Sequence, residues 1–170
     1  MASQERPVIK LASPARWAVR ADMDDALLGA SLVFAGAAVW GSAAAIRDQL
    51  PGQPLGITVP LSVPAGLAAG WGAGVAAPWP MPVAAVAAAA AARHRAPSPW
   101  PGVVCAMIGA GCIAGTLIEP VTRQPGSWSR STALAIGFNI AASAGLIAAG
   151  VRHSASTRAH NAAGPAATAG

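Results

Sequence analysis

The stretch "PGVVCAMIGAGCIAGTLIEP", residues 101–120, contains no charged side chain until Glu119. At about 1.5 Å per residue, a helix over residues 102–118 would be about 25 Å long, close to the ~30 Å hydrocarbon core of a bilayer. Pro101 suits a first helical turn, where its missing N–H leaves no hydrogen bond unmade. Pro120 disfavours helical geometry at the preceding residue. The stretch therefore predicts a membrane-spanning helix over about residues 101–119.

The composition of the whole chain extends this prediction. Of its 170 residues, 54% are hydrophobic and only 10% are charged, whereas about a quarter of the residues in a soluble domain are charged. Uncharged stretches of about 20 residues or more, the length of a membrane-crossing helix, occupy residues 26–46, 49–92, 96–118 and 131–151. The sequence thus predicts an all-α integral membrane protein.

Residues 49–92 are too long for one ordinary crossing and contain prolines at positions 51, 54, 60, 64, 78, 80 and 82. They would form either one crossing, kinked or broken, or two short crossings with a turn at the later prolines. Lys and Arg concentrate on the cytoplasmic side of membrane proteins. Four crossings place eight of them inside and three outside, whereas five crossings give six and five. We therefore predict a four-helix bundle with its second helix kinked or broken.

The predicted spans are about 26–46, 62–92 with a break near 78–82, 101–119 and 131–151, so that both termini are cytoplasmic. Residues 1–21 would form a basic cytoplasmic tail. Residues 152–170 lack apolar periodicity, which predicts a disordered tail. The bias towards alanine, with Lys10 as the sole lysine, suggests a GC-rich bacterial genome and hence a bacterial cytoplasmic (inner) membrane. The basic residues flank the hydrophobic spans, so we expect a lipid bilayer as partner and no nucleic acid.

Glu119 is the one acidic residue between Asp48 and the C-terminus. One interpretation is a structural helix boundary, at which Arg123 or Arg130 offsets the unfavourable contact of a carboxylate with the negative end of its helix dipole. The other is a functional carboxylate that binds a cation or moves a proton.

Asn139 carries the strongest hydrogen-bonding side chain deep in a predicted span. An amide in lipid needs a partner, so Asn139 should face another helix. It would then act as a link between helices. Alternatively, Glu119, Arg123, Arg130 and Asn139 would line an outward-facing polar pocket, together with Thr122 and with Trp40 and Ser42 from the first span.

Small residues recur every four positions in the predicted spans. The series are Ala37, Gly41, Ala45; Gly66, Gly70, Gly74; Gly111, Gly115; and Gly137, Ala141, Gly145. Such ridges let helix backbones approach closely in lipid. They would pack the bundle internally, or dock a membrane-protein partner or a second copy of the chain.

The sequence contains none of the common catalytic, phosphate-binding or metal-binding motifs that we sought. His153 and His160 fall in or beside the predicted loose tail, without partners at metal-ligand spacing. We therefore expect no metal and no cofactor. The favoured function is a non-enzymatic accessory or interaction subunit. The alternative is a small-molecule or ion carrier that uses the pocket around Glu119 and Asn139.

Overall fold

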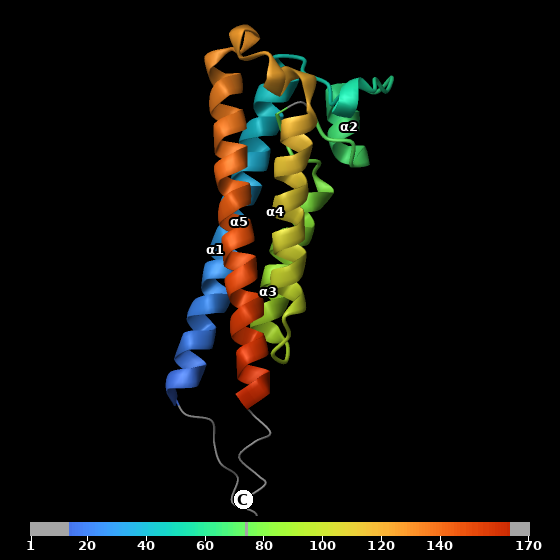
Figure 1. Cartoon of the computed structure of the whole chain (residues 1–170). Coiled ribbons are helices and arrows are strands. Elements are labelled where there is room, and N and C mark those ends of the chain that lie inside the picture. Colours follow the sequence, from blue (N-terminus) through green and yellow to red (C-terminus); the bar gives the residue numbers. More distant parts are fainter. Residues whose placement is uncertain (1–13, 74, 164–170) are drawn as a thin grey trace, which may run out of the picture.

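The computed structural model describes residues 14–73 and 75–163, and these residues are almost entirely helical (Figure 1). The helices are α1 (Pro14–Arg47), α2 (Val63–Ala69), α3 (Pro80–His94), α4 (Trp100–Ile118) and α5 (Arg130–Ala163), with short 3-10 turns at Pro54–Gly56, Pro120–Arg123 and Pro125–Ser127. The described ranges contain no β-strand, only two isolated bridges at Ala73. The prediction of an all-α chain is therefore confirmed.

Three of these helices are long and apolar enough to cross a membrane. The qualifying segments are Arg20–Arg47 in α1, Trp100–Ile118 in α4 and Arg130–Ala162 in α5. Helix α3 has 15 residues, which corresponds to about 22 Å at about 1.5 Å per residue. It is therefore shorter than the ~30 Å hydrocarbon core.

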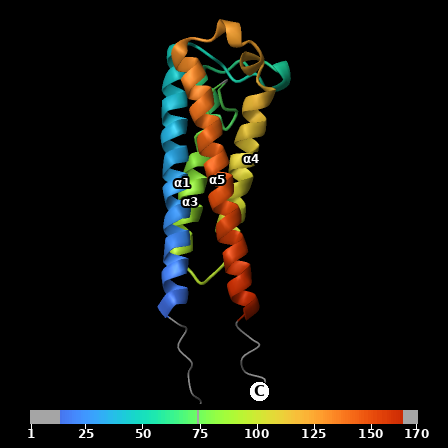
Figure 2. The same cartoon turned by 60° about the vertical axis from the view of Figure 1, so that its left-hand side comes forward.

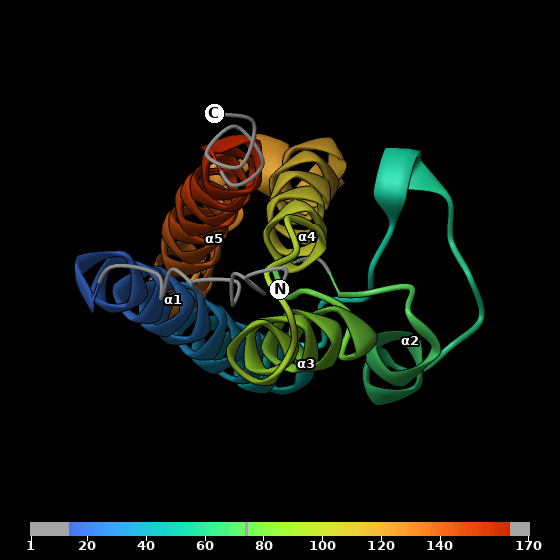
Figure 3. The ribbon, with the colours of Figure 1, turned by 90° about the horizontal axis from the view of Figure 1, so that it is seen from below.

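Helices α1, α3, α4 and α5 lie side by side and together form what we call the helical body (Figures 1 and 2). Helix α5 packs against both α4 and α1, and α3 packs against α1 and α4 (Figure 3). The start of α1, the end of α5 and the loop 95–99 lie together at one end, the tail end. The segments 48–62 and 119–129 lie at the opposite end, the loop end, with α2 to one side (Figure 1).

The described residues between α2 and α3, 70–73 and 75–79, are not helical, and we call this stretch the interval 70–79. Helix α2 ends at Ala69 and is capped by Gly70, whose φ of 87° is left-handed, and Gly72 follows with φ of 85°. These conformations are readily adopted only by glycine. Pro80 opens α3, in whose first turn proline costs no hydrogen bond. The predicted break at 78–82 is therefore misplaced, because the interval covers residues 70–79 and Pro80 and Pro82 belong to α3.

Both predicted tails are partly helical, which corrects the sequence-based boundaries. Helix α1 begins at Pro14, inside the predicted tail 1–21, and α5 continues to Ala163, inside the predicted disordered tail 152–170. His153 and Ser154 are buried in this extension, so it packs against the helical body. The predictions for residues 1–13 and 164–170 lie outside the described residues.

Some glycines lie where two backbones approach closely, but several of these are not in the small-residue ridges predicted from the sequence. A Cβ atom at Gly109 on α4 would lie 2.6 Å from the Ser143 carbonyl oxygen on α5, and one at Gly41 would lie 2.7 Å from the Val75 carbonyl oxygen. The first predicted ridge, Ala37, Gly41, Ala45, is indeed buried. In contrast, Gly111, Gly137 and Gly145 have open space where a Cβ would stand. Internal packing by these three glycines was therefore wrongly predicted.

Candidate functional site

Glu119 lies at the C-terminal end of α4 and is buried, with 7% of its surface exposed. Its backbone is extended (φ −67°, ψ 134°), as expected for a residue that precedes proline. Its carboxylate Oε2 accepts a hydrogen bond of 2.9 Å from the backbone N–H of Gln53. Burial raises the pKa of Glu119, and the Gln53 N–H partly opposes this rise.

The predicted ion pair between Glu119 and Arg123 or Arg130 is wrong. Among the described residues, Glu119 forms no salt bridge. The turn Pro120–Arg123 carries Arg123 into a separate surface hollow beside Leu55 and Pro120. Arg130 is exposed at the first residue of α5. Neither arginine therefore forms a salt bridge with the buried carboxylate in the described part of the chain.

Asn139 on α5 is 1% exposed and faces α4, as the sequence predicted for an amide in lipid. Its Nδ2 donates a 2.9 Å hydrogen bond to Oγ1 of Thr116. The main-chain oxygen of Thr116 in turn accepts a 2.6 Å hydrogen bond from the hydroxyl of Thr122. Among the described residues, the buried Oδ1 atom of Asn139 has no hydrogen-bond partner. Asn139 thus links two helices and retains one unused acceptor.

Glu119 and Asn139 line the same cavity at the loop end, which has a volume of about 140 Å³. Its other walls come from α4, the start of α3 and the non-helical interval 70–79, and include Trp71, Met81, Cys112 and Thr116. Within the described part of the chain, no Lys, Arg or His lines this cavity. Buried polar groups normally find hydrogen-bond partners, so the free Oδ1 of Asn139 marks a position suited to a hydrogen-bond donor.

Only part of the predicted pocket comes together. Glu119 and Asn139 share the cavity, whereas Arg123, Arg130, Trp40 and Ser42 do not line it. Ser42 instead accepts a hydrogen bond from Trp79 Nε1 at 3.0 Å. Sequence reasoning missed Thr116 and Cys112, although both lie on the Glu119 helix at helical spacings of three and seven residues. The contribution of Trp71 depends on the irregular interval, for which the sequence offers no periodic signal.

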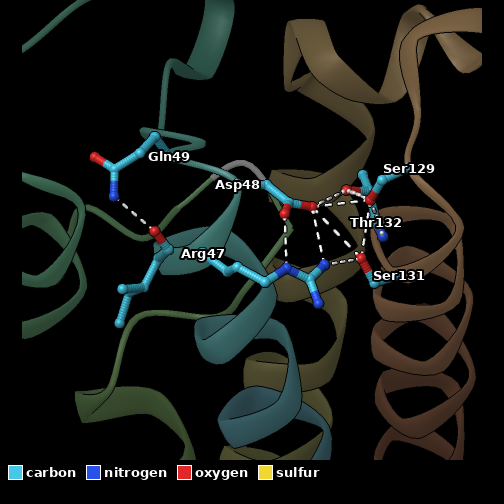
Figure 4. Close-up of polar contacts among 7 residues, drawn as sticks. Arg47, Asp48, Gln49, Ser129, Ser131 and Thr132 are labelled. Carbon is cyan, nitrogen blue, oxygen red and sulfur yellow. Dashed lines mark hydrogen bonds and ion pairs between the residues drawn. The ribbon is translucent and has the colours of Figure 1, made fainter.

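A second polar cluster joins the end of α1 to the start of α5 at the loop end (Figure 4). The Asp48 carboxylate accepts hydrogen bonds from Arg47 Nε at 2.8 Å, Ser129 Oγ at 2.8 Å and Thr132 Oγ1 at 3.0 Å. Arg47 also donates to Ser131. The bond from Arg47, followed by that from Ser129, lowers the pKa of Asp48. These hydrogen bonds join the end of α1 to the start of α5, so we interpret the cluster as a structural clamp.

His153 lies within helix α5, whereas the sequence analysis placed it in or beside a loose tail. It is buried on α5, and its Nε2 lies 3.0 Å from Oδ1 of Asp24 on α1. Within the described ranges, no group of three His, Cys, Asp or Glu side chains is arranged to hold a metal ion. The pair joins α5 to α1.

Comparison of the chain with family models, with curated proteins and with solved structures found no match.

Proposed function

We propose that this protein is a four-helix bundle in a bacterial cytoplasmic membrane, with α2, the interval 70–79 and α3 as a broken second crossing. Both termini are then cytoplasmic. This placement is supported by the position of Arg93, Arg95 and Arg152 near the tail end and of Arg47 and Arg130 near the loop end. With residues 1–13 on the tail side, eight Lys and Arg face the cytoplasm and three face the opposite side.

Within this bundle, we propose that the cavity at the loop end binds a small solute and that the protein acts as a small-molecule or ion carrier. One observation carries the proposal: Glu119 and Asn139 line a single cavity, and the buried Oδ1 of Asn139 has no partner. A purely structural link would need only the bond from Asn139 to Thr116. Broken helices often border the binding sites of membrane carriers, and the non-helical interval 70–79 forms part of this wall.

The test compares solute binding by the purified wild type, in which the cavity is open, with binding by a variant in which a side chain fills the cavity. Gly115 lines the cavity and has open space where a Cβ would stand, so Gly115→Leu should fill it without disturbing the backbone. Gly36→Leu is the matched control, because Gly36 is an exposed, unhindered glycine on α1. The thermal unfolding midpoint would be measured with small amines, alkali cations, carboxylates and neutral amides.

At least one solute class should raise the midpoint of the wild type and of Gly36→Leu, but not that of Gly115→Leu. If no class raises the midpoint, or if Gly115→Leu responds like the wild type, the cavity does not serve as a solute site.

A second candidate function is that of a non-enzymatic accessory or interaction subunit. The supporting observation is the ridge Gly137, Ala141, Gly145 on α5, which is exposed along its whole length. Such a smooth ridge suits close approach of a membrane partner or a second copy. Gly137→Leu and Gly145→Leu should then abolish a stoichiometric complex seen after purification in mild detergent, whereas Gly36→Leu should preserve it. An unchanged complex would exclude this ridge as the interface.

A further inference from the structure

The polar atoms of the cavity define which solutes it suits. The Glu119 carboxylate accepts one hydrogen bond, from Gln53, out of the roughly four that an ionised carboxylate can accept. Asn139 Oδ1 is a free acceptor, and its Nδ2 is already committed to Thr116. The lining is therefore rich in acceptors and offers a ligand few donors.

The charge of the cavity follows from a single group. Besides Glu119, the only titratable side chain in its lining is the Cys112 thiol. Residues 49–92 and helix α4 contain no Asp, Glu, Lys or Arg. Arg123 lies on the 3-10 turn that follows Glu119, but it does not line the cavity and forms no salt bridge with Glu119 among the described residues. On α5, Arg130 lies at the exposed helix start and is the nearest charged residue in sequence to Asn139. An ionised Glu119 would therefore stay uncompensated unless the ligand were positive.

We propose that this cavity binds a small primary ammonium ion, with the Glu119 carboxylate as counter-charge and Asn139 Oδ1 as a hydrogen-bond acceptor. The assignment rests on the proposed solute-binding function and specifies its ligand class. The two oxygens accept N–H bonds of the ammonium group, and bonds to an ionised partner are shorter and stronger than neutral ones. The apolar wall of Trp71, Met81 and Ala77 surrounds the carbon atoms.

The size of the cavity agrees with a short amine. A volume of about 140 Å³ is close to that of an engineered protein cavity of ~150 Å³ that binds benzene, which suits an amine of a few heavy atoms. Ca²⁺ takes about six to eight oxygen ligands, usually including several carboxylates, and this lining provides one carboxylate. An anion would meet the carboxylate without a compensating Lys or Arg.

Ligand binding is coupled to the protonation of Glu119. When the side chain is protonated, ammonium binding breaks the carboxyl O–H bond and releases that proton to water, which leaves a carboxylate paired with the bound cation. Burial raises the pKa of Glu119, so the protonated form persists to higher pH than in an exposed glutamate. The affinity for an ammonium ion therefore increases with pH until Glu119 is fully ionised.

The experiment is isothermal titration of the full-length protein in detergent with methylammonium between about pH 4 and pH 8. This range begins near the ordinary glutamate pKa of about 4.3 and extends above it, and methylammonium stays charged throughout. Tetramethylammonium carries the same charge without an N–H, potassium is a bare cation, and acetamide is a neutral solute. Two buffers with different heats of ionisation report the proton released. The variants are Glu119→Gln, Gly115→Leu, Gly36→Leu and, as a control for loss of an exposed acid, Asp22→Asn.

Methylammonium should bind at least tenfold more tightly than the other three solutes and release protons at the acidic end of the range. Glu119→Gln should weaken it by roughly tenfold to a hundredfold, the effect of losing a hydrogen bond to a charged group. Gly36→Leu and Asp22→Asn should bind like the wild type. The pH series on the wild type tests the role of Glu119 even if Glu119→Gln fails to fold.

Two results would overturn the ammonium assignment while keeping the solute site. One is equal or tighter binding of potassium, tetramethylammonium or acetamide that Gly115→Leu still abolishes. The other is methylammonium binding that is independent of pH and unchanged in Glu119→Gln but lost in Gly115→Leu. Undiminished binding by Gly115→Leu would instead contradict the solute site itself.

Discussion

His153 Nε2 on α5 and Asp24 Oδ1 on α1 lie 3.0 Å apart, although 129 positions separate them in the sequence. The second carboxylate oxygen of Asp24 lies 3.6 Å from Arg20 Nε. Both partners of the central pair are buried, so neither side chain can easily exchange the other for water. The contact holds the C-terminal part of α5 against the N-terminal part of α1.

Removing the histidine should therefore destabilise the protein. His153→Ala leaves Asp24 buried without its principal partner, so we expect the free energy of unfolding to fall by about 1–3 kcal/mol. His160→Ala is the control, because His160 lies exposed further along the same helix. Thermal unfolding in detergent measures the difference. Equal midpoints for the two variants would show that the buried pair contributes nothing.

Two glycines on α4 should respond oppositely to the same substitution. Gly109→Ala places a methyl group 2.6 Å from the Ser143 carbonyl oxygen, and we expect it to cost about 1–3 kcal/mol through overpacking. Gly111 faces open space, so Gly111→Ala should be neutral or should stabilise by up to about 1 kcal/mol, since alanine favours helix. Denaturation of both variants under identical conditions provides the measurement. A loss of stability in Gly111→Ala as large as that in Gly109→Ala would contradict the described packing of α4 on α5.

The Asp48 clamp should make stability depend on acidity. Its folded-state pKa is lowered by bonds from Arg47 and Ser129, so its contribution is complete above the unfolded value of about 3.9 and is lost as the pH falls below it. The unfolding midpoint of the wild type should therefore decline below about pH 4. Asp48→Asn should reduce that decline, whereas Asp22→Asn, at an exposed site, should not. Identical acid profiles for the wild type and Asp48→Asn would exclude a stabilising role for the carboxylate.

The proposed topology places the loop 95–99 and the segment 119–129 on opposite sides of the membrane. Single cysteines introduced at His94 and Gly126, both exposed, should react with an impermeant thiol reagent from opposite sides. A background with Cys105→Ala and Cys112→Ala removes the two native thiols, which are free and buried. Labelling of both positions from one side would refute the four-crossing arrangement.

The long helices were predictable because lipid imposes a length and a composition that are visible in sequence. The helix ends were less predictable. Pro80 and Pro82 look like a break inside a helix, yet they occupy the first turn of α3, just as the proline rule predicted for Pro101. The extension of α5 to Ala163 was missed because its stability comes from contacts with distant residues such as Asp24 and Pro99.

Two residues of the candidate site, Glu119 and Asn139, could be predicted from the sequence. A carboxylate at a helix end and an amide within a span both stand out in an apolar sequence, and Glu119 and Asn139 indeed share a cavity. The arginines were not predictable, because their positions depend on how the 3-10 turn Pro120–Arg123 exits from α4. Charge proximity in the sequence suggested an ion pair that the turn geometry prevents.

For the proposed membrane topology, the shortness of α3 has a consequence for how the helices would be inserted. An isolated helix of 15 residues falls below the roughly 20 residues that cross a bilayer, so α3 is a poor substrate for insertion by itself. It is followed after the loop 95–99 by the longer and more apolar α4. We therefore expect biogenesis to proceed with α3 and α4 inserting together as a helical hairpin. Nascent chains that end before residue 118 would then leave α3 outside the bilayer.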